Sequence, residues 1–141
     1  MIRSLFAAAV VLFALLRPAS AEDDPFFISY WGGPPLDAAA DARYADVAAA
    51  HFTVAGPGAS SKESNLVFLV HCQKHGLRAL VHDPRLGADP AQPDFQAKID
   101  GVVADYAAHP ALYGYFLQDE PNANEFPRLA AVNAQIGRAH V

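Results

Sequence analysis

The chain has 141 residues, a formal net charge of −5 at neutral pH, an apolar fraction of 52% and one cysteine. The negative charge and the lack of a basic cluster argue against a nucleic-acid-binding protein, which would present Lys and Arg to the phosphate backbone. Cys72 cannot form an internal disulfide, and its place in an apolar helical pattern predicts a buried packing role.

The N-terminus has the three parts of a secretory signal peptide. Arg3 precedes an apolar run from Leu5 to Leu16, and Ala19-Ser20-Ala21 offers a cleavage site. The apolar run is shorter than the ~20 residues that span a bilayer and ends at Arg17-Pro18, which argues against a membrane anchor. We therefore predict that residues 1–21 form a signal peptide and that the mature protein is secreted or periplasmic, without membrane attachment.

The last residues of the chain, 136–141, read IGRAHV. This string matches the translation of the adapter that is ligated to DNA fragments in common short-read sequencing. We therefore expect residues 136–141 to be a sequencing artefact and the native segment to span residues 22–135. On that interpretation part of the protein is missing, and we expect this chain on its own to be inactive and poorly folded.

Apolar runs typical of strands alternate with amphipathic runs typical of helices. In the first half of the chain, a strand is predicted over 26–31 (FFISYW), followed by GGPP, a helix capped by Asp37, and a second strand over 52–56. Serines at 60, 61 and 64 are positioned to cap the next helix, which Gly76 ends.

The second half repeats the alternation. We predict a strand over 77–82, a helix over 93–109, a strand over 111–117 and a helix over 125–135. The order β-α-β-α-β-α-β-α requires parallel strands with right-handed crossovers. A doubly wound open sheet and the first half, (βα)4, of a TIM (β/α)8 barrel both accept this order. The barrel is favoured, because GGPP lacks the glycine-rich phosphate fingerprint of a nucleotide site, and no cofactor is expected.

Both architectures place active sites at the carboxyl ends of the strands. The residues predicted there are Tyr30, Trp31, His82, Asp83, Arg85, Asp119 and Glu120. Each has a structural alternative: Trp31 covering the barrel end, a hydrogen-bonded structural His82, a turn at Asp83-Pro84, and Arg85 paired with a nearby aspartate. No metal site is predicted, because the spacing of the remaining histidines does not suggest one.

The adjacent acids Asp119 and Glu120 are the strongest chemical signal. A helix N-terminus favours one carboxylate and has no need of two in succession at a strand end. Glycoside cleavage requires a carboxyl group that protonates the leaving oxygen and a second carboxylate opposite it. We expect the charge of Asp119, with partial enclosure by Trp31 and Tyr115, to raise the pKa of Glu120, as a general acid requires.

The strings ISYWGGPP, HDPR and HPALYGYFLQDEPN resemble secreted bacterial (β/α)8 proteins of the glycoside hydrolase type, in the clan of cellulase-like and β-galactosidase-like barrels. The resemblance covers residues 26–135 and implies a carbohydrate substrate. It also implies that Glu120, which is followed by Pro121, is the acid/base residue that ends the fourth strand. Asp119 stands where the family commonly has asparagine, so the substrate contact at that position differs. The family's nucleophile lies on the seventh strand, beyond the strands predicted here.

The leading functional prediction is therefore an exported glycosidase that uses Glu120 as general acid/base, with Asp119, His82, Asp83, Arg85, Trp31 and Tyr30 around the sugar. The alternative is a carbohydrate-binding or surface-interaction barrel without catalysis. A metal-dependent hydrolase is less favoured, because such barrels usually carry paired histidines at the end of the first strand, and none is present there.

Overall fold

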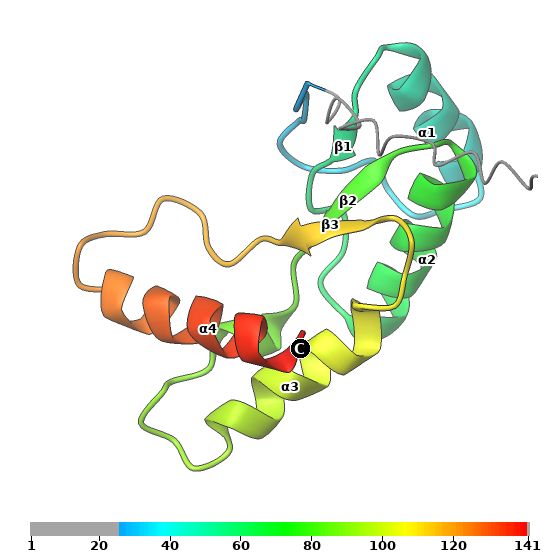
Figure 1. The fold of residues 1–141 in the computed structure, drawn as a ribbon. Coiled ribbons are helices and arrows are strands. Elements are labelled where there is room, and N and C mark those ends of the chain that lie inside the picture. The colour runs from blue at the N-terminus through cyan, green and yellow to red at the C-terminus, as the bar shows by residue number, and fades with distance from the viewer. Residues whose placement is uncertain (1–25, 141) are drawn as a thin grey trace, which may run out of the picture.

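The computed structural model describes residues 26–140, so the predicted signal peptide and Val141 lie outside the described part. The described chain is a mixed α/β structure with four α-helices and a small parallel sheet (Figure 1). No helix in this part is long and apolar enough to cross a membrane. In chain order the elements are α1 (Ala40–Ala49), β1 (Val54–Ala55), α2 (Lys62–Lys74), β2 (Arg78–Val81), the short 3₁₀ helix η1 (Pro84–Gly87), α3 (Phe95–Tyr106), β3 (Leu112–Tyr115) and α4 (Phe126–Ala139).

The three strands form one sheet in the order β1-β2-β3, and both pairs are parallel. Val54 lies opposite Arg78, and Ala79 lies opposite Leu112. Because the strands are parallel, their carboxyl ends meet at one edge of the sheet. The predicted parallel α/β arrangement is therefore confirmed for these three strands.

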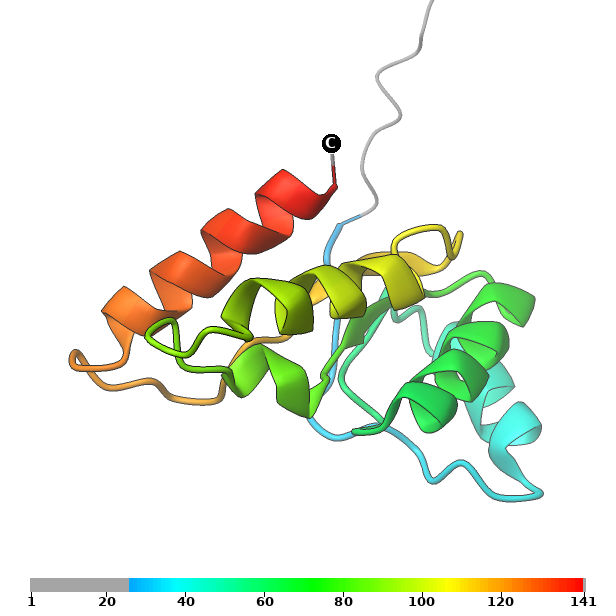
Figure 2. The same ribbon diagram turned by 90° about the horizontal axis from the view of Figure 1, so that it is seen from below.

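The helices cover one side of the sheet. Ala79 and Val81 of β2 are fully buried in the core shared with α2 and α3, whereas Arg78 is exposed and Leu80 is half-buried on the other side. Figure 2 shows α3 across the sheet, with α2 on one side of it and α4 on the other. The largest core side chains from these helices are Phe68, Leu69, Ile99, Val102 and Tyr106.

The first predicted strand, 26–31, is wrong as a regular strand. This segment runs beside β1, but the side chain of Thr53 replaces part of the backbone ladder. Ile28 N–H donates to Thr53 Oγ1 (3.0 Å), the hydroxyl donates to the Phe26 carbonyl (2.8 Å), and the N–H groups of Thr53 and Val54 both donate to the Ile28 carbonyl. The segment is thus attached to the sheet without regular pairing.

The residue after β1 must be a glycine for this attachment to exist. A Cβ atom on Gly56 would lie 2.0 Å from the carbonyl oxygen of Tyr30, well inside van der Waals contact. The absence of a side chain at Gly56 therefore allows two backbone segments to approach closely.

The helix ends follow local signals in α2 more closely than in α1. Ser61 and Ser64 form a capping box at the start of α2, and Gly76 follows its end with a φ of 70°, as predicted. Asp37, however, does not cap α1, which starts at Ala40. It accepts from the Ala39 N–H (2.9 Å) in the preceding turn and pairs with Arg43 (2.6 Å).

Two further predictions concern the helices. Cys72 is fully buried in α2, as predicted, and burial raises the pKa of its thiol to about 12. The fourth helix was expected to stop near Gln135, but α4 continues to Ala139. Gln135 is itself buried and donates to Asp100 of α3 (2.6 Å), so this end of α4 is held against α3.

Candidate functional site

Three aromatic rings meet at the carboxyl edge of the sheet. The centroid of the Trp31 ring lies 5.1 Å from that of Phe116, and the centroid of the His82 ring lies 6.1 Å from that of Phe116. Both pairs are edge-on. Trp31 is 65% exposed, so most of the indole faces solvent. The structure thus brings together Trp31 and His82, two predicted site residues, around Phe116, which was not predicted.

A hollow of about 240 Å³ lies beside these rings. Its walls are almost entirely apolar, and they are formed by Phe27, Ser29, Tyr30, Trp31, Gly56, Pro57, Leu80 and Phe116. The ring of Tyr30 also packs edge-on against Phe52 at 5.3 Å, and burial raises the pKa of its phenol. Tyr30 therefore faces the protein interior more than the open edge.

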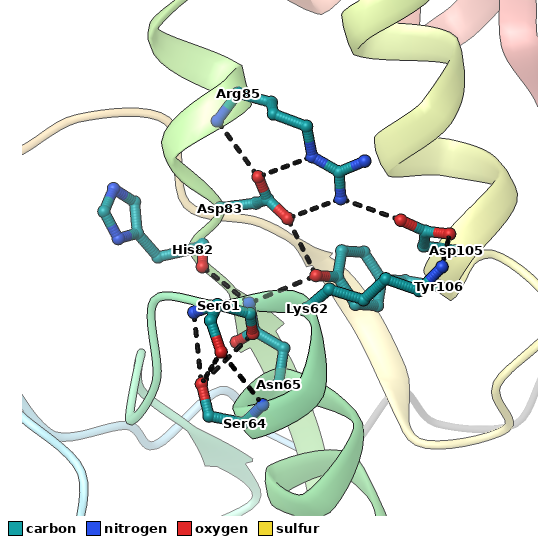
Figure 3. A network of polar contacts seen from close by, with 9 residues as sticks. All are labelled: Ser61, Lys62, Ser64, Asn65, His82, Asp83, Arg85, Asp105 and Tyr106. Carbon is teal, nitrogen blue, oxygen red and sulfur yellow. Dashed lines mark hydrogen bonds and ion pairs between the residues drawn. The ribbon is translucent and has the colours of Figure 1, made fainter.

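Asp83 is at the centre of a buried polar network (Figure 3). Its side chain is 2% exposed and accepts four hydrogen bonds. Arg85 donates three of them, from its backbone N–H (3.0 Å), Nε (2.9 Å) and Nη2 (2.7 Å), and the hydroxyl of Tyr106 donates the fourth (2.7 Å). Both carboxylate oxygens are therefore occupied by partners from the protein.

The network extends from Asp83 to two helices. Arg85 Nη2 also donates to Asp105 of α3 (2.8 Å). Asn65, fully buried on α2, donates its amide to the carbonyl of His82 (2.8 Å) and contacts the hydroxyl of Tyr106 (3.3 Å). The network thus holds the backbone that follows β2, and the imidazole of His82 lies outside the network (Figure 3).

This geometry favours the structural alternative for two of the predicted substrate contacts. Burial alone would raise the pKa of Asp83, but the hydrogen bonds from Arg85 and Tyr106 outweigh it, and the pKa is lowered. Asp83 is ionised, enclosed and fully paired, and Arg85 is engaged with Asp83 and Asp105. The structural alternative, a pairing of Arg85 with a nearby aspartate, describes these residues: Asp83 has no unpaired carboxylate oxygen, and Arg85, whose side chain is 33% exposed, uses Nε and Nη2 in the network.

Asp119 and Glu120 lie in the loop after β3, and both are exposed. The expected enclosure of Glu120 is not seen in the described part of the chain, because Tyr115 packs toward α4, with its ring 5.8 Å from that of His140. The backbone of Glu120 is unusual, with a φ of 39°. Only His51 shares a positive φ among the described non-glycine residues.

A different carboxylate organises this loop. Glu125 accepts from the side chain of Gln118 with one oxygen, and with the other from the backbone N–H (2.9 Å) and the side-chain amide (2.7 Å) of Asn122. Gln118 in turn accepts from Arg128, which also donates to the Leu86 carbonyl (3.2 Å). The hydrogen bonds from Gln118 and Asn122 lower the pKa of Glu125.

The sequence interpretation missed several residues that shape this region. Glu125 stands three residues after Asn122, the spacing of a capping box, and that signal was available. Asn65 lies on the same helical face as Leu69 and Cys72, which marks it as a buried amide that needs partners. Phe116 had no local signal, since its contacts come from distant segments.

Within residues 26–140, no three histidine, cysteine or acidic side chains are arranged to hold a metal ion. No protein-family model, curated protein or solved structure matches the chain. The described fold is a small mixed α/β structure with a three-stranded parallel sheet, exposed Trp31 beside Phe116 and His82, and two exposed acids in the loop after β3.

Proposed function

We propose that this chain is the (βα)4 half of a secreted (β/α)8 barrel that hydrolyses O-glycosidic bonds, with Glu120 as the general acid/base. The observation that carries the proposal is the backbone of Glu120. A non-glycine residue in the left-handed region costs roughly 1–2 kcal/mol, and such strain concentrates at functional sites. Here it occurs at an acid in the loop after the last strand of a parallel sheet, the edge at which α/β enzymes build their sites.

The aromatic edge supports a carbohydrate as the substrate. Sugar rings present C–H groups that pack on aromatic faces, and Trp31 offers a largely exposed indole steadied by Phe116. The imidazole of His82 stands beside Phe116 and outside the buried network, so the network does not use its nitrogens, and they are proposed to contact sugar hydroxyls. Asp119 supplies a hydrogen-bond acceptor next to the proposed acid.

The proposed chemistry follows from two carboxyl groups. Glu120 donates a proton to the glycosidic oxygen as the bond from that oxygen to the anomeric carbon breaks, and the leaving group departs as an alcohol. The second carboxylate bonds to the anomeric carbon as the leaving group departs. Water then displaces this carboxylate from the anomeric carbon, and the carboxylate of Glu120 accepts the proton that the water releases. In the proposed barrel the second carboxylate and the walls that enclose Glu120 come from later strands.

The test is turnover of aryl glycosides by the intact secreted protein and its Glu120→Gln variant. The amide keeps the size of the side chain but has no acidic proton, so we expect kcat/KM to fall by about 10²- to 10⁴-fold. The matched control is Glu63→Gln, which alters an exposed acid on α2. Full activity in Glu120→Gln would remove the assigned role.

A non-catalytic carbohydrate-binding barrel is the second candidate, and the exposure of Trp31 favours it independently of Glu120. Trp31 is the only tryptophan in the chain, so its fluorescence reports on this edge alone. Sugar binding that changes this fluorescence, without turnover of any glycoside by the intact protein, would select the binding function.

A further inference from the structure

We propose that Glu125 is a positioning residue that fixes the shape of the loop carrying Glu120. The inference rests on the proposed function for its catalytic meaning, but the contacts that carry it are independent of catalysis. It concerns the loop from Gln118 to Asn122, which leaves β3 and leads into α4.

The carboxylate of Glu125 connects the two ends of this loop. One oxygen takes the side-chain amide of Gln118, before the acids, and the other takes both N–H donors of Asn122, after them. The side chain of Asn122 then accepts from the N–H of Asn124 (3.0 Å), which closes the turn into α4. Glu120 lies between the two tethered ends, in the left-handed backbone conformation.

We call the three hydrogen bonds that Glu125 accepts from Gln118 and Asn122 the clamp. Arg128 connects the clamp to the rest of the fold. This residue donates to the side chain of Gln118 and to the carbonyl of Leu86 in η1. The loop after β3 is thereby connected to the segment after β2, where His82 is held by Asn65. The two edge segments that carry the proposed acid and the proposed histidine contact are fixed by adjoining sets of hydrogen bonds.

The physical reason for assigning a positioning role is the unfavourable backbone of Glu120. A positive φ is unfavourable for a non-glycine residue, and hydrogen bonds at both ends of an exposed loop help to hold the residue in it. Charge-assisted hydrogen bonds to a carboxylate are stronger than neutral ones, and Glu125 makes three. No other side chain described in the structure joins both ends of the loop.

The first arm of the test measures amide hydrogen exchange in the 141-residue chain, resolved at Asn122. In the wild type we expect this amide to be protected by its bond to Glu125, and in Glu125→Ala we expect it to exchange about tenfold faster. Glu63→Ala, which removes an exposed acid from α2, is expected to leave Asn122 unchanged. Because Glu125→Ala could also loosen α4, Asn122→Ala is the second variant, and we expect faster exchange at Asn124 there.

The second arm uses turnover by the intact protein, with two aryl glycosides that differ in leaving group. Phenyl glycosides need a proton from the acid, whereas dinitrophenyl glycosides depart without one. If Glu125 positions Glu120, Glu125→Ala lowers kcat/KM, which reports the step that releases the leaving group, by about 10²-fold for the phenyl substrate and affects kcat/KM for the dinitrophenyl substrate much less. A loss that is equal for both substrates would indicate general damage and would overturn the positioning role.

The exchange measurement tests the clamp, and the turnover measurement tests the proposed function. An unprotected Asn122 amide in the wild type, or unchanged exchange of that amide in Glu125→Ala, rejects the clamp whatever the protein catalyses. Absence of glycoside turnover by the wild-type intact protein rejects the proposed function, while exchange that responds to Glu125→Ala would still establish the clamp as the device that orders this loop.

Discussion

Asp83 shows how a buried carboxylate at the sheet edge can serve the fold instead of a ligand. Its partners come from η1 and α3, and Asn65 of α2 joins them through Tyr106 and the carbonyl of His82. A single side chain thereby sets the position of the backbone from which His82 projects. We expect the sensitivity of this region to mutation to be centred on Asp83.

We predict that Asp83→Asn lowers the free energy of unfolding by about 3 kcal/mol at pH 7, because the guanidinium of Arg85 and the hydroxyl of Tyr106 would both face a group that carries donors of its own. Asp105 still pairs with Arg85 in this variant. The expected loss of unfolding free energy is therefore at the lower end of the range for removing one partner of a buried ion pair. Urea denaturation followed by circular dichroism measures the change, with the exposed Asp46→Asn as control. A difference below about 0.5 kcal/mol would contradict the central role of Asp83.

The contribution of Asp83 to the free energy of unfolding depends on pH with a definite sign. The folded-state pKa of Asp83 is lowered, so its stabilising contribution is present above the ordinary value of 3.8 and is lost as the pH falls below it. The stability difference between wild type and Asp83→Asn should therefore shrink on acidification from pH 5 toward the lowered pKa.

At the scale of elements, Thr53 explains why the first extended segment is not a strand. Its hydroxyl occupies the place of a backbone partner, between the N–H of Ile28 and the carbonyl of Phe26. We predict that Thr53→Val, which has nearly the same shape, lowers the free energy of unfolding by about 1 kcal/mol and accelerates amide exchange at Ile28. Thr53→Ser keeps the hydroxyl and should restore protection at Ile28, whereas equal exchange in all three proteins would count against this account.

Elements were predictable from the sequence where their signals are local. Helix α2 begins after the capping serine Ser61 and ends just before the left-handed Gly76. Both signals lie next to the helix end that they set, and both a serine cap and the terminating glycine were predicted. The segment 26–31 has the composition of a strand, yet its pairing depends on Thr53, more than twenty residues away in sequence. Composition cannot reveal such a replacement of ladder hydrogen bonds by a side chain.

The same distinction applies to the candidate site. The parallel strand order and the gathering of Trp31 and His82 at one edge followed from the alternation of elements. The assignment of Asp83 to the interior did not, because it depends on Tyr106 and Asn65, which come from two other elements. The adjacency of Asp119 and Glu120 marked the loop after β3 in the sequence, but Glu125 is the acid whose hydrogen bonds connect the ends of that loop.

At the scale of the whole molecule, the side of the sheet away from the helices is apolar and is exposed within residues 26–140. Phe26, Phe27, Trp31 and Tyr113 are 82%, 48%, 65% and 47% exposed, and Phe27 contacts Tyr113 across this side at 5.6 Å. In the described chain β3 pairs only with β2, which leaves its other edge available. Exposed apolar side chains next to a free strand edge favour association between copies.

We therefore predict that the 141-residue chain self-associates at micromolar concentration. Sedimentation velocity should show the weight-average mass rising above that of the 15.0 kDa monomer as concentration increases. Replacement of Phe27 and Tyr113 by Ser removes apolar area from the exposed side without touching the helix-covered core, and it should shift the chain toward monomer by at least about tenfold in dissociation constant. Replacement of Val67 and Val70, exposed on α2, is the matched control and should not change association. A wild-type chain that stays monomeric and unfolds in one cooperative transition would show that the exposed side is stable in water, and the expectation that this chain folds poorly by itself would then be wrong.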